Sequence, residues 1–284
     1  MDLLITLKSF LRALIPKQNF KVNIFIIGAQ KSGTSALHSY MLNHREIIGG
    51  KVKEINYFNH KEKYAKGDNW YHNQFVKPLF YKPKKYFIDS TPQYITDENV
   101  AEMIFQYNPN AHIIVLLRNP VERAYSAWNM YKQFSEFTDV NRKKLADRHA
   151  SLQNRKLFYN FITTNPFPSF EDFAEKELKN IDTYPRILKK GIYVEQLIPY
   201  YKLFPKNKIT IIESKDFKQN KLEYLNLIFD KLELSNIQDL TLEDVHKREY
   251  VSKMKLETKN KLIEFYKPYN EKLSELTGLK FNWS

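Results

Sequence analysis

Short apolar runs alternate with longer amphipathic stretches along this chain of 284 residues. Apolar runs of about four to eight residues are typical of buried strands, whereas apolar positions three and four apart are typical of helices. The predicted strands are Val22–Ile27, Tyr86–Asp89, His112–Leu117 and Ile209–Ile212. The predicted helices lie near Thr34–Asn43, Asp97–Tyr107 and Pro120–Gln133 and over Arg186–Phe204, and another begins at Ser169. This alternation predicts an α/β fold in which helices flank a central parallel β-sheet, with ligand sites at the carboxyl ends of the strands.

Two stretches do not follow this pattern. The interval Ser135–Pro166 is polar and basic, and only Phe158–Ile162 resembles a core segment, so it is either an excursion beside the acceptor or a solvated helix hairpin. Residues Met1–Ile15 carry leucines at helical spacing, which predicts an amphipathic helix that packs on the domain or touches a membrane surface. We therefore expect an N-terminal helix over residues 1–20 and one P-loop-type domain over residues 21–284.

The amino-acid composition limits the class of protein and the kind of ligand that the chain can bind. With 43% hydrophobic and 15% aromatic residues, the chain can bury a large core and is not of the disordered class. It has no cysteine, which excludes a disulfide framework and fits a reducing compartment, and we expect a cytoplasmic, bacterial enzyme. The formal charge of +13 favours binding of a polyanion, but a phosphorylated donor, an acidic glycan and a nucleic acid would all satisfy it.

The first candidate site lies between a predicted strand and a predicted helix, in Phe25–Leu37. Gly28 and Gly33 frame a turn like the phosphate-binding loop of nucleoside-triphosphate enzymes, G-x-x-x-x-G-K-[ST]. Here Thr34 occupies the lysine position, and Lys31 lies two residues before Gly33. The Lys31 ammonium is therefore expected to reach the group on a nucleotide's innermost phosphate, which favours a short 5′-linked donor over ATP.

A second strand-to-helix junction follows the predicted strand that ends at Leu117. Asn119 is a good N-cap and the proline after it suits the first helical position, so Arg118 leaves the strand at its carboxyl end. Ser126 lies two turns further, roughly 10 Å along the same face. The arginine fork and the serine hydroxyl can bind one anion there. The alternative is a surface ion pair for Arg118 and a solvated position for Ser126.

Together, the patterns G-x-Q-K-[ST]-G-T-[ST]-x-L and R-[ND]-P-x-x-R-A-x-S resemble the donor-binding segments of sulfotransferases that use 3′-phosphoadenosine 5′-phosphosulfate (PAPS). The resemblance extends over most of the chain and is strongest to the heparan-sulfate-type and bacterial carbohydrate branch. It implies that the first loop holds the 5′ side of PAPS and the second segment its 3′-phosphate. The implied donor-binding residues are Gln30, Lys31, Ser32, Gly33, Thr34, Ser35, Arg118 and Ser126, with Lys247 and Arg248 either as further contacts or as a solvated basic cluster.

The resemblance also implies a catalytic base, Glu54. The segment Lys53–Phe58 is similar to the heparan-type K-E-x-x-[FY]-F, in which the glutamate has this role. An acceptor hydroxyl or amine loses a proton as it attacks sulfur, and a nearby carboxylate can take it. Lys31 would stabilise the charge that builds on the leaving oxygen. On composition alone, Glu54 would instead pair with Lys51 or Lys53 at the surface.

The acceptor side departs from the heparan-type pattern. Tyr86–Tyr94 resembles [ED]-K-[ST]-P-x-Y, but Ser90 stands where that branch usually has lysine, and Gln196 stands where it often has histidine. These differences put a heparan-type acceptor in doubt and leave the donor chemistry unchanged. We expect a glycan or a small hydroxylated acceptor, and the implied contacts are Lys53, Asp89, Thr91 and Tyr94.

The sequence thus predicts a PAPS-dependent sulfotransferase that needs no metal, because it has no metal-binding motif. Two alternatives remain open. A P-loop kinase for a small molecule would share the fold, but Thr34 in the lysine position and the lack of an evident acidic magnesium partner disfavour it. A non-enzymatic polyanion-binding protein would suit the charge, but no nucleic-acid-binding motif accompanies that charge, so we expect no nucleic-acid partner.

Overall fold

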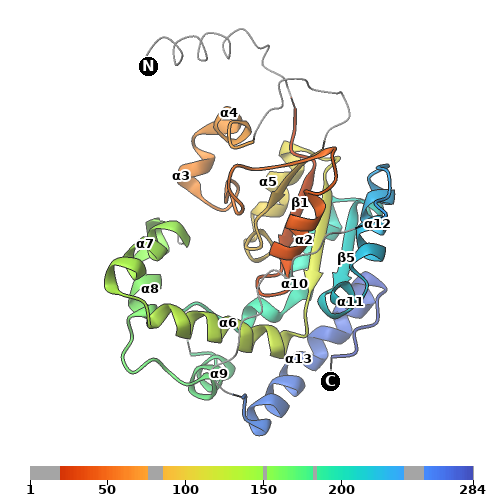
Figure 1. Ribbon diagram of the computed structural model, residues 1–284. Coiled ribbons are helices and arrows are strands. Elements are labelled where there is room, and N and C mark those ends of the chain that lie inside the picture. Colours follow the sequence, from red (N-terminus) through yellow and green to blue (C-terminus); the bar gives the residue numbers. More distant parts are fainter. Residues whose placement is uncertain (1–19, 76–85, 150–151, 182–183, 240–252, 284) are drawn as a thin grey trace, which may run out of the picture.

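Five parallel strands form the centre of the protein, in the order β2-β3-β1-β4-β5 (Figure 1). The structure is a computed structural model that describes residues 20–75, 86–149, 152–181, 184–239 and 253–283. All neighbouring strands pair in parallel, so their carboxyl ends lie at one edge of the sheet. This arrangement confirms the predicted α/β fold. The strands are β1 Ile24–Gly28, β2 Ile47–Gly49, β3 Tyr86–Ser90, β4 His112–Leu117 and β5 Ile209–Glu213.

Alternate side chains of each strand serve two hydrophobic cores, one on each face of the sheet. In β1, Phe25 and Ile27 belong to one core, whereas Ile24 and Ile26 belong to the other. Every residue of β1 is buried, as expected for a parallel strand that helices cover on both faces. The first core is covered by α5 Val100–Tyr107, α10 Tyr193–Leu203 and α13 Leu256–Thr277, and the second by α2 Thr34–Met41, α11 Ser214–Gln219 and α12 Lys221–Lys231.

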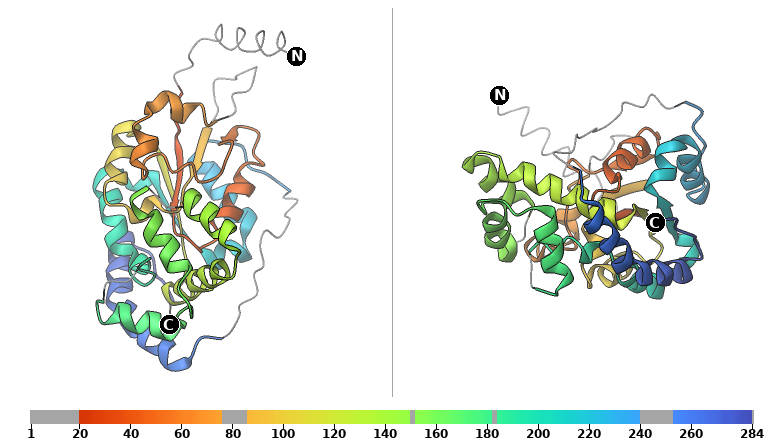
Figure 2. Two further views of the ribbon diagram at one scale, coloured as in Figure 1. Left: turned by 90° about the vertical axis from the view of Figure 1, so that its left-hand side faces the viewer. Right: turned by 90° about the horizontal axis from the view of Figure 1, so that it is seen from below.

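Helix α6, Pro120–Ser135, runs from the end of β4 away from the sheet. The pair α7 Asp139–His149 and α8 Leu152–Ile162 packs at its far end, and Figures 1 and 2 show this pair standing apart from the sheet. The described part of residues 135–166 therefore contains the packed helices of the hairpin alternative, and a position beside the acceptor stays a prediction. Helix α9, Phe170–Leu178, follows and begins where predicted, because Ser169 caps it by accepting a hydrogen bond from the Asp172 amide at 3.1 Å.

The predicted helix over Arg186–Phe204 is wrong in its first half. A 3₁₀ turn, η2 Lys189–Gly191, comes first, and α10 begins only at Tyr193. A Cβ atom at Gly191 would lie 2.9 Å from the Tyr266 hydroxyl, so α13 packs directly on this turn. The predicted helix over residues 1–20 lies outside the described residues except for Phe20. The sequence pattern also missed several elements, which are β2, α3 Lys61–Tyr64, α4 Gly67–His72, η1 Tyr94–Thr96, η3 Lys206–Lys208, α11 and α12.

Candidate active site

A cleft of about 1580 Å³ opens at the carboxyl ends of the strands. Its walls come from the loops after β1, β3, β4 and β5, from residues near 54–60 and 184–190, and from α6, α7 and α8. Among the predicted site residues, Lys53, Asp89, Thr91 and Tyr94 are absent from its walls, and Lys247 and Arg248 lie outside the described residues. The predicted residues that line it are Gln30, Lys31, Ser32, Gly33, Thr34, Ser35, Glu54, Arg118 and Ser126.

The loop after β1 has a constrained backbone. Gly28 lies against Ile95, where an added Cβ would approach the Ile95 Cγ2 to 2.6 Å, so a larger residue would displace the loop. Gly33 has φ +99° and Lys31 has φ +71°, a left-handed conformation that glycine adopts freely and lysine adopts with strain. This geometry holds the loop and its lysine at the cleft wall.

The first turn of α2 has room for an anion. Gly33 is the N-cap, and no side chain caps this turn within the described part of the chain. Thr34 and Ser35 line the cleft at this helix start, where backbone N–H groups lack helical partners. Ser32 is buried, and its hydroxyl makes no hydrogen bond of good geometry to another described residue. The loop therefore fits a phosphate or sulfate group, which uncapped helix starts bind well.

Arg118 connects the two junctions. Its Nη1 donates to the Lys31 carbonyl at 3.4 Å, and its Nε and Nη2 donate to the Glu122 carboxylate at 3.1 and 3.0 Å. The Tyr193 hydroxyl donates to the Arg118 carbonyl at 2.8 Å and fixes the backbone. The ion pair that the sequence offered as an alternative is thus present, but the same guanidinium also lines the cleft. A bound anion would compete with Glu122 for it.

Helix α6 begins as the sequence predicted. The Asn119 side chain accepts hydrogen bonds from the amides of Val121 and Glu122 at 3.0 and 3.4 Å, and the proline after it occupies the first helical position. Ser126 lies two turns along, is 7% exposed and lines the cleft. Arg118 and Ser126 therefore reach one cleft from a single rigid junction.

Glu54 lies on a loop that contains two left-handed residues. The φ angles are +63° at Glu54 and +56° at Asn56. The Glu54 side chain is 32% exposed and lines the cleft, and Lys53 pairs with one of its oxygens at 2.7 Å. Asn56 donates to the Glu54 carbonyl at 2.6 Å, and Lys63 donates to the Ile55 carbonyl at 2.7 Å. Strained backbone of this kind persists only where surrounding contacts hold it, and it gathers at functional sites.

The acidic and aromatic residues that the sequence assigned to acceptor binding form a buried network instead. Asp89, Thr91 and Tyr94 are at most 1% exposed, and this burial corrects the expected acceptor contact. Asp89 accepts hydrogen bonds from the hydroxyls of Tyr71, Tyr94 and Thr91, each at 2.8 Å. Burial raises the pKa of the Asp89 carboxyl, although these hydrogen bonds oppose the shift. The Tyr94 hydroxyl in turn accepts from the Tyr57 amide at 3.0 Å, so the network anchors the loop of the candidate base.

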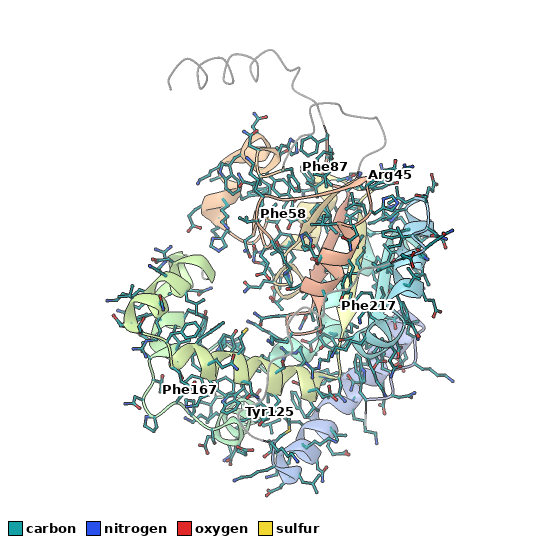
Figure 3. The ribbon with its side chains drawn as sticks, viewed as in Figure 1. Arg45, Phe58, Phe87, Tyr125, Phe167 and Phe217 are labelled. Carbon is teal, nitrogen blue, oxygen red and sulfur yellow. The ribbon has the colours of Figure 1, made fainter. Side chains whose placement is uncertain are left out.

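Aromatic packing supports the same loop. Phe58, labelled in Figure 3, packs edge-on against Tyr71 and Tyr94 with centroid separations of 5.4 and 5.7 Å. Tyr57 stacks on Tyr71 at 4.3 Å. The aromatic positions of Lys53–Phe58 are therefore structural, and they keep Glu54 at the cleft.

Ser90, where the heparan-type pattern has lysine, contacts a buried histidine. The His38 Nδ1 and the Ser90 Oγ lie 2.7 Å apart. Burial, with a smaller contribution from the charge of Lys53, lowers the pKa of His38 to about 4, so the ring is neutral at neutral pH. The charge of Glu54 opposes that shift, which places the histidine close to the candidate base.

Sequence reasoning missed several basic residues on the cleft wall. Lys190 is the most unusual of them, because burial and the charge of Arg123 lower its pKa to about 8. Gly191, which follows Lys190, indicates in the sequence that the predicted helix is interrupted there. In the structure, Lys189 and Lys190 of this interruption line the cleft. Gln196 also lines the cleft and donates to the Lys189 carbonyl at 3.2 Å. The basic residues are Arg186, Lys189, Lys190, Lys218 and Lys221.

The described residues contain no group of three or more histidine, aspartate or glutamate side chains that could hold a metal ion. In the same part of the chain, no helix has the length and apolar character needed to cross a bilayer. The His44 side chain is buried, and its Nε2 lies 3.0 Å from the Ser235 carbonyl oxygen.

An uncapped helix start and an arginine at neighbouring strand ends of a parallel sheet define a P-loop-like group-transfer fold. The chain belongs to the sulfotransferase family, because the family model described as "Sulfotransferase domain" matches residues 21–275. It is therefore a sulfotransferase enzyme, and neither the kinase nor the non-enzymatic alternative describes it.

Curated relatives match most of this chain. It is 27% identical to the membrane-associated sulfotransferase kil1 of Dictyostelium discoideum, over 92% of this chain and 66% of that protein. It is 26% identical to heparan sulfate glucosamine 3-O-sulfotransferase 5 of Mus musculus, over 91% of this chain and 72% of that protein. The bifunctional heparan sulfate N-deacetylase/N-sulfotransferase of Drosophila melanogaster is 25% identical over 75% of this chain, which spans 20% of that longer protein.

A solved structure shares the fold. The sulfotransferase from Alicyclobacillus acidocaldarius superposes with a TM-score of 0.65 and 20% sequence identity, over 92% of this chain and 98% of that one. The two proteins therefore share the arrangement of the sheet and its helices over most of this chain.

Proposed function

We propose that this sulfotransferase transfers the sulfuryl group of PAPS to a hydroxyl or amine of an acceptor, with a carbohydrate as the expected acceptor class. The observation that carries the proposal is the meeting of Lys31, Arg118 and Glu54 in one cleft. Two anion-binding junctions and a carboxylate are the groups that this reaction requires. Two of the relatives are named for heparan sulfate, which supports a carbohydrate acceptor.

The two junctions divide the donor between them. The loop after β1, with its uncapped helix start, suits the 5′ phosphosulfate, and the start of α6 suits the 3′-phosphate. Lys247 and Arg248 remain proposed additional contacts. The proposed donor-binding residues on the described part of the chain are Gln30, Lys31, Ser32, Gly33, Thr34, Ser35, Arg118 and Ser126.

The chemistry is an in-line displacement at sulfur. The acceptor oxygen or nitrogen forms a bond to sulfur, and the bond between sulfur and the bridging phosphate oxygen breaks. Glu54 takes the acceptor proton, and the Lys31 ammonium balances the negative charge on the departing oxygen. The products are the sulfated acceptor and adenosine 3′,5′-bisphosphate. The Lys53 ammonium lies 2.7 Å from one oxygen of the Glu54 carboxylate.

We also propose that residues 21–284 form the catalytic domain, that an amphipathic helix occupies residues 1–20, and that the enzyme works in a bacterial cytoplasm. The family match over residues 21–275 supports the domain, and the lack of cysteine supports a reducing compartment. We further propose that residues 1–15 contact a membrane surface, which the relative described as membrane-associated supports.

Titration calorimetry tests the donor site directly. The protein is titrated without added metal with adenosine 3′,5′-bisphosphate, ADP and ATP. We expect clear preference for the bisphosphate, because only this ligand presents a phosphate to each junction. Preference for ATP, or no nucleotide binding, would contradict the PAPS assignment.

A further inference from the structure

The cleft has two chemically different walls. The basic residues that line it come from the strand ends and from the segments around 186–190 and 218–221. The lining residues contributed by the described parts of α6 beyond Ser126, of α7 and of α8 carry no charge. They are Met130, Tyr131, Phe134, Leu145, Asn154, Leu157 and Phe158, and we call this set the apolar wall.

The apolar wall is notable because the helices behind it are highly charged. In α7, Asp139 pairs with Lys143 at 2.8 Å, and Asp147 pairs with Arg155 of α8 at 3.1 Å. These ion pairs neutralise charge among themselves and none of the four residues lines the cleft. Leu145, by contrast, is the one leucine of α7, and it does line the cleft.

Part of the apolar wall is exposed. Leu157 is 51% exposed, and Met130, Phe134 and Leu145 are partly exposed. When an apolar part of a ligand covers apolar side chains in a cleft, both surfaces leave water, and this burial favours binding. An anionic acceptor would gain less there, because its sulfates or carboxylates would lose water against a wall whose described residues include no cation.

We propose that the acceptor carries an uncharged apolar group, an alkyl chain or an aromatic ring, which lies against the apolar wall while its hydroxyl or amine faces Glu54. This inference rests on the proposed function and narrows its acceptor class. A polyanionic glycan of the heparan type is the alternative that it excludes. Glu54, Asn59 and His60 line the same cleft as the apolar wall.

Matched glycosides test the inference. Methyl β-D-glucoside, n-octyl β-D-glucoside below its micellar concentration and a heparosan oligosaccharide are each titrated into the protein saturated with adenosine 3′,5′-bisphosphate. The same compounds are then assayed as acceptors with PAPS. Each buried methylene favours binding about fourfold, so we expect the octyl glucoside to bind at least tenfold more tightly than the methyl glucoside. Equal binding of the two glucosides, or tighter binding of the heparosan oligosaccharide, overturns the inference.

Variants locate the effect. Leu157→Lys places a charge on the apolar wall and should reduce the octyl preference about tenfold, with unchanged affinity for adenosine 3′,5′-bisphosphate. Leu227→Lys is the control, because Leu227 of α12 is 40% exposed and lies outside the cleft lining. A loss of bisphosphate affinity in Leu157→Lys would assign the wall to the donor and refute the inference. Failure of the unmodified protein to bind the bisphosphate would instead contradict the proposed function itself.

Discussion

The proposed donor end and the proposed acceptor end of the cleft are built in different ways. The donor end consists of two strand-to-helix junctions, in which Lys31 comes three residues after the end of β1 and Arg118 comes directly after β4. The acceptor end combines the strained loop of Glu54 with side chains of α6, α7 and α8, which are far apart in the sequence. One end therefore depends on local backbone geometry, and the other depends on tertiary packing. The difference suggests that donor use is fixed by the sheet, while acceptor choice can change with the helices that surround it.

The largest expected effect separates the two ends at Glu54. In Glu54→Gln the side chain keeps its shape but cannot take the acceptor proton, so turnover should fall by about 10²- to 10⁴-fold. Affinity for adenosine 3′,5′-bisphosphate, measured by calorimetry, should stay within twofold. Glu62→Gln is the matched control, because Glu62 pairs with His60 at 3.5 Å, is 42% exposed and lies outside the cleft lining. Unchanged turnover in Glu54→Gln would remove this residue from the role of base.

Substitution of Arg118 should instead weaken donor binding. Charge-assisted hydrogen bonds contribute about 1.5–3 kcal/mol, so Arg118→Ala should weaken bisphosphate binding by about 10- to 100-fold. The affinity should also depend less steeply on salt than in the unmodified protein.

Arg142→Ala provides the control for Arg118→Ala. Arg142 also lies near a helical carboxylate, with Asp139 at 3.9 Å, and is 24% exposed, but it does not line the cleft. Equal bisphosphate affinity in the Arg118 variant and in this control would contradict the 3′-phosphate assignment.

The two strand-to-helix junctions could be predicted from sequence because their determinants are local. Gly28, Gly33 and the Asn119 cap specify how the chain leaves one strand and enters the next helix. The four longest strands were predicted for a similar reason, since a parallel strand is a continuous apolar run. The short edge strand β2 has too few residues for such a signal.

The residues of the acceptor end could not be predicted, because which of them line the cleft depends on which side chains the fold buries. Asp89 and Tyr94 are polar residues next to a turn, which resembles a binding site in sequence, yet the structure places them inside the core. Leu145 and Leu157 belong to a polar interval whose helical arrangement had to be known before either could be placed at the cleft. Sequence patterns specify the type of an element more reliably than its neighbours.

Two tyrosines test whether the Asp89 network supports the acceptor end specifically. Tyr71→Phe and Tyr94→Phe each remove one hydroxyl that donates to Asp89 at 2.8 Å. Each should lower the free energy of unfolding by about 1–3 kcal/mol, measured by urea denaturation. Only the Tyr94 hydroxyl also accepts from the Tyr57 amide, so only Tyr94→Phe should reduce turnover. Equal turnover in the two variants would show that the network stabilises the core without positioning the Glu54 loop.

The last prediction is a pH dependence of stability. The pKa values of His38, near the Glu54 loop, and of His112, at the opposite end of β4, are both lowered to about 4, chiefly by burial. The unfolded chain, with an ordinary histidine pKa near 6.5, therefore binds protons that the folded chain does not. The free energy of unfolding should be highest above pH 6.5 and should fall toward pH 4, by at most about 1.4 kcal/mol per pH unit for each histidine.

Substitution separates the contributions of the two histidines. His38→Asn retains a polar atom for Ser90 and should flatten the pH dependence by the His38 share, and His112→Asn should do the same for its own share. Urea denaturation at pH 7.0, 6.0 and 5.0 measures both. In the folded enzyme the His38 ring stays neutral over this pH range, because its pKa is about 4, so His38→Asn should leave the pH dependence of turnover between pH 7.0 and 5.0 unchanged. A pH dependence of turnover that His38→Asn alters and His112→Asn does not would show that the ring takes up a proton in the folded enzyme, and that the two ends of the cleft differ in their response to acid.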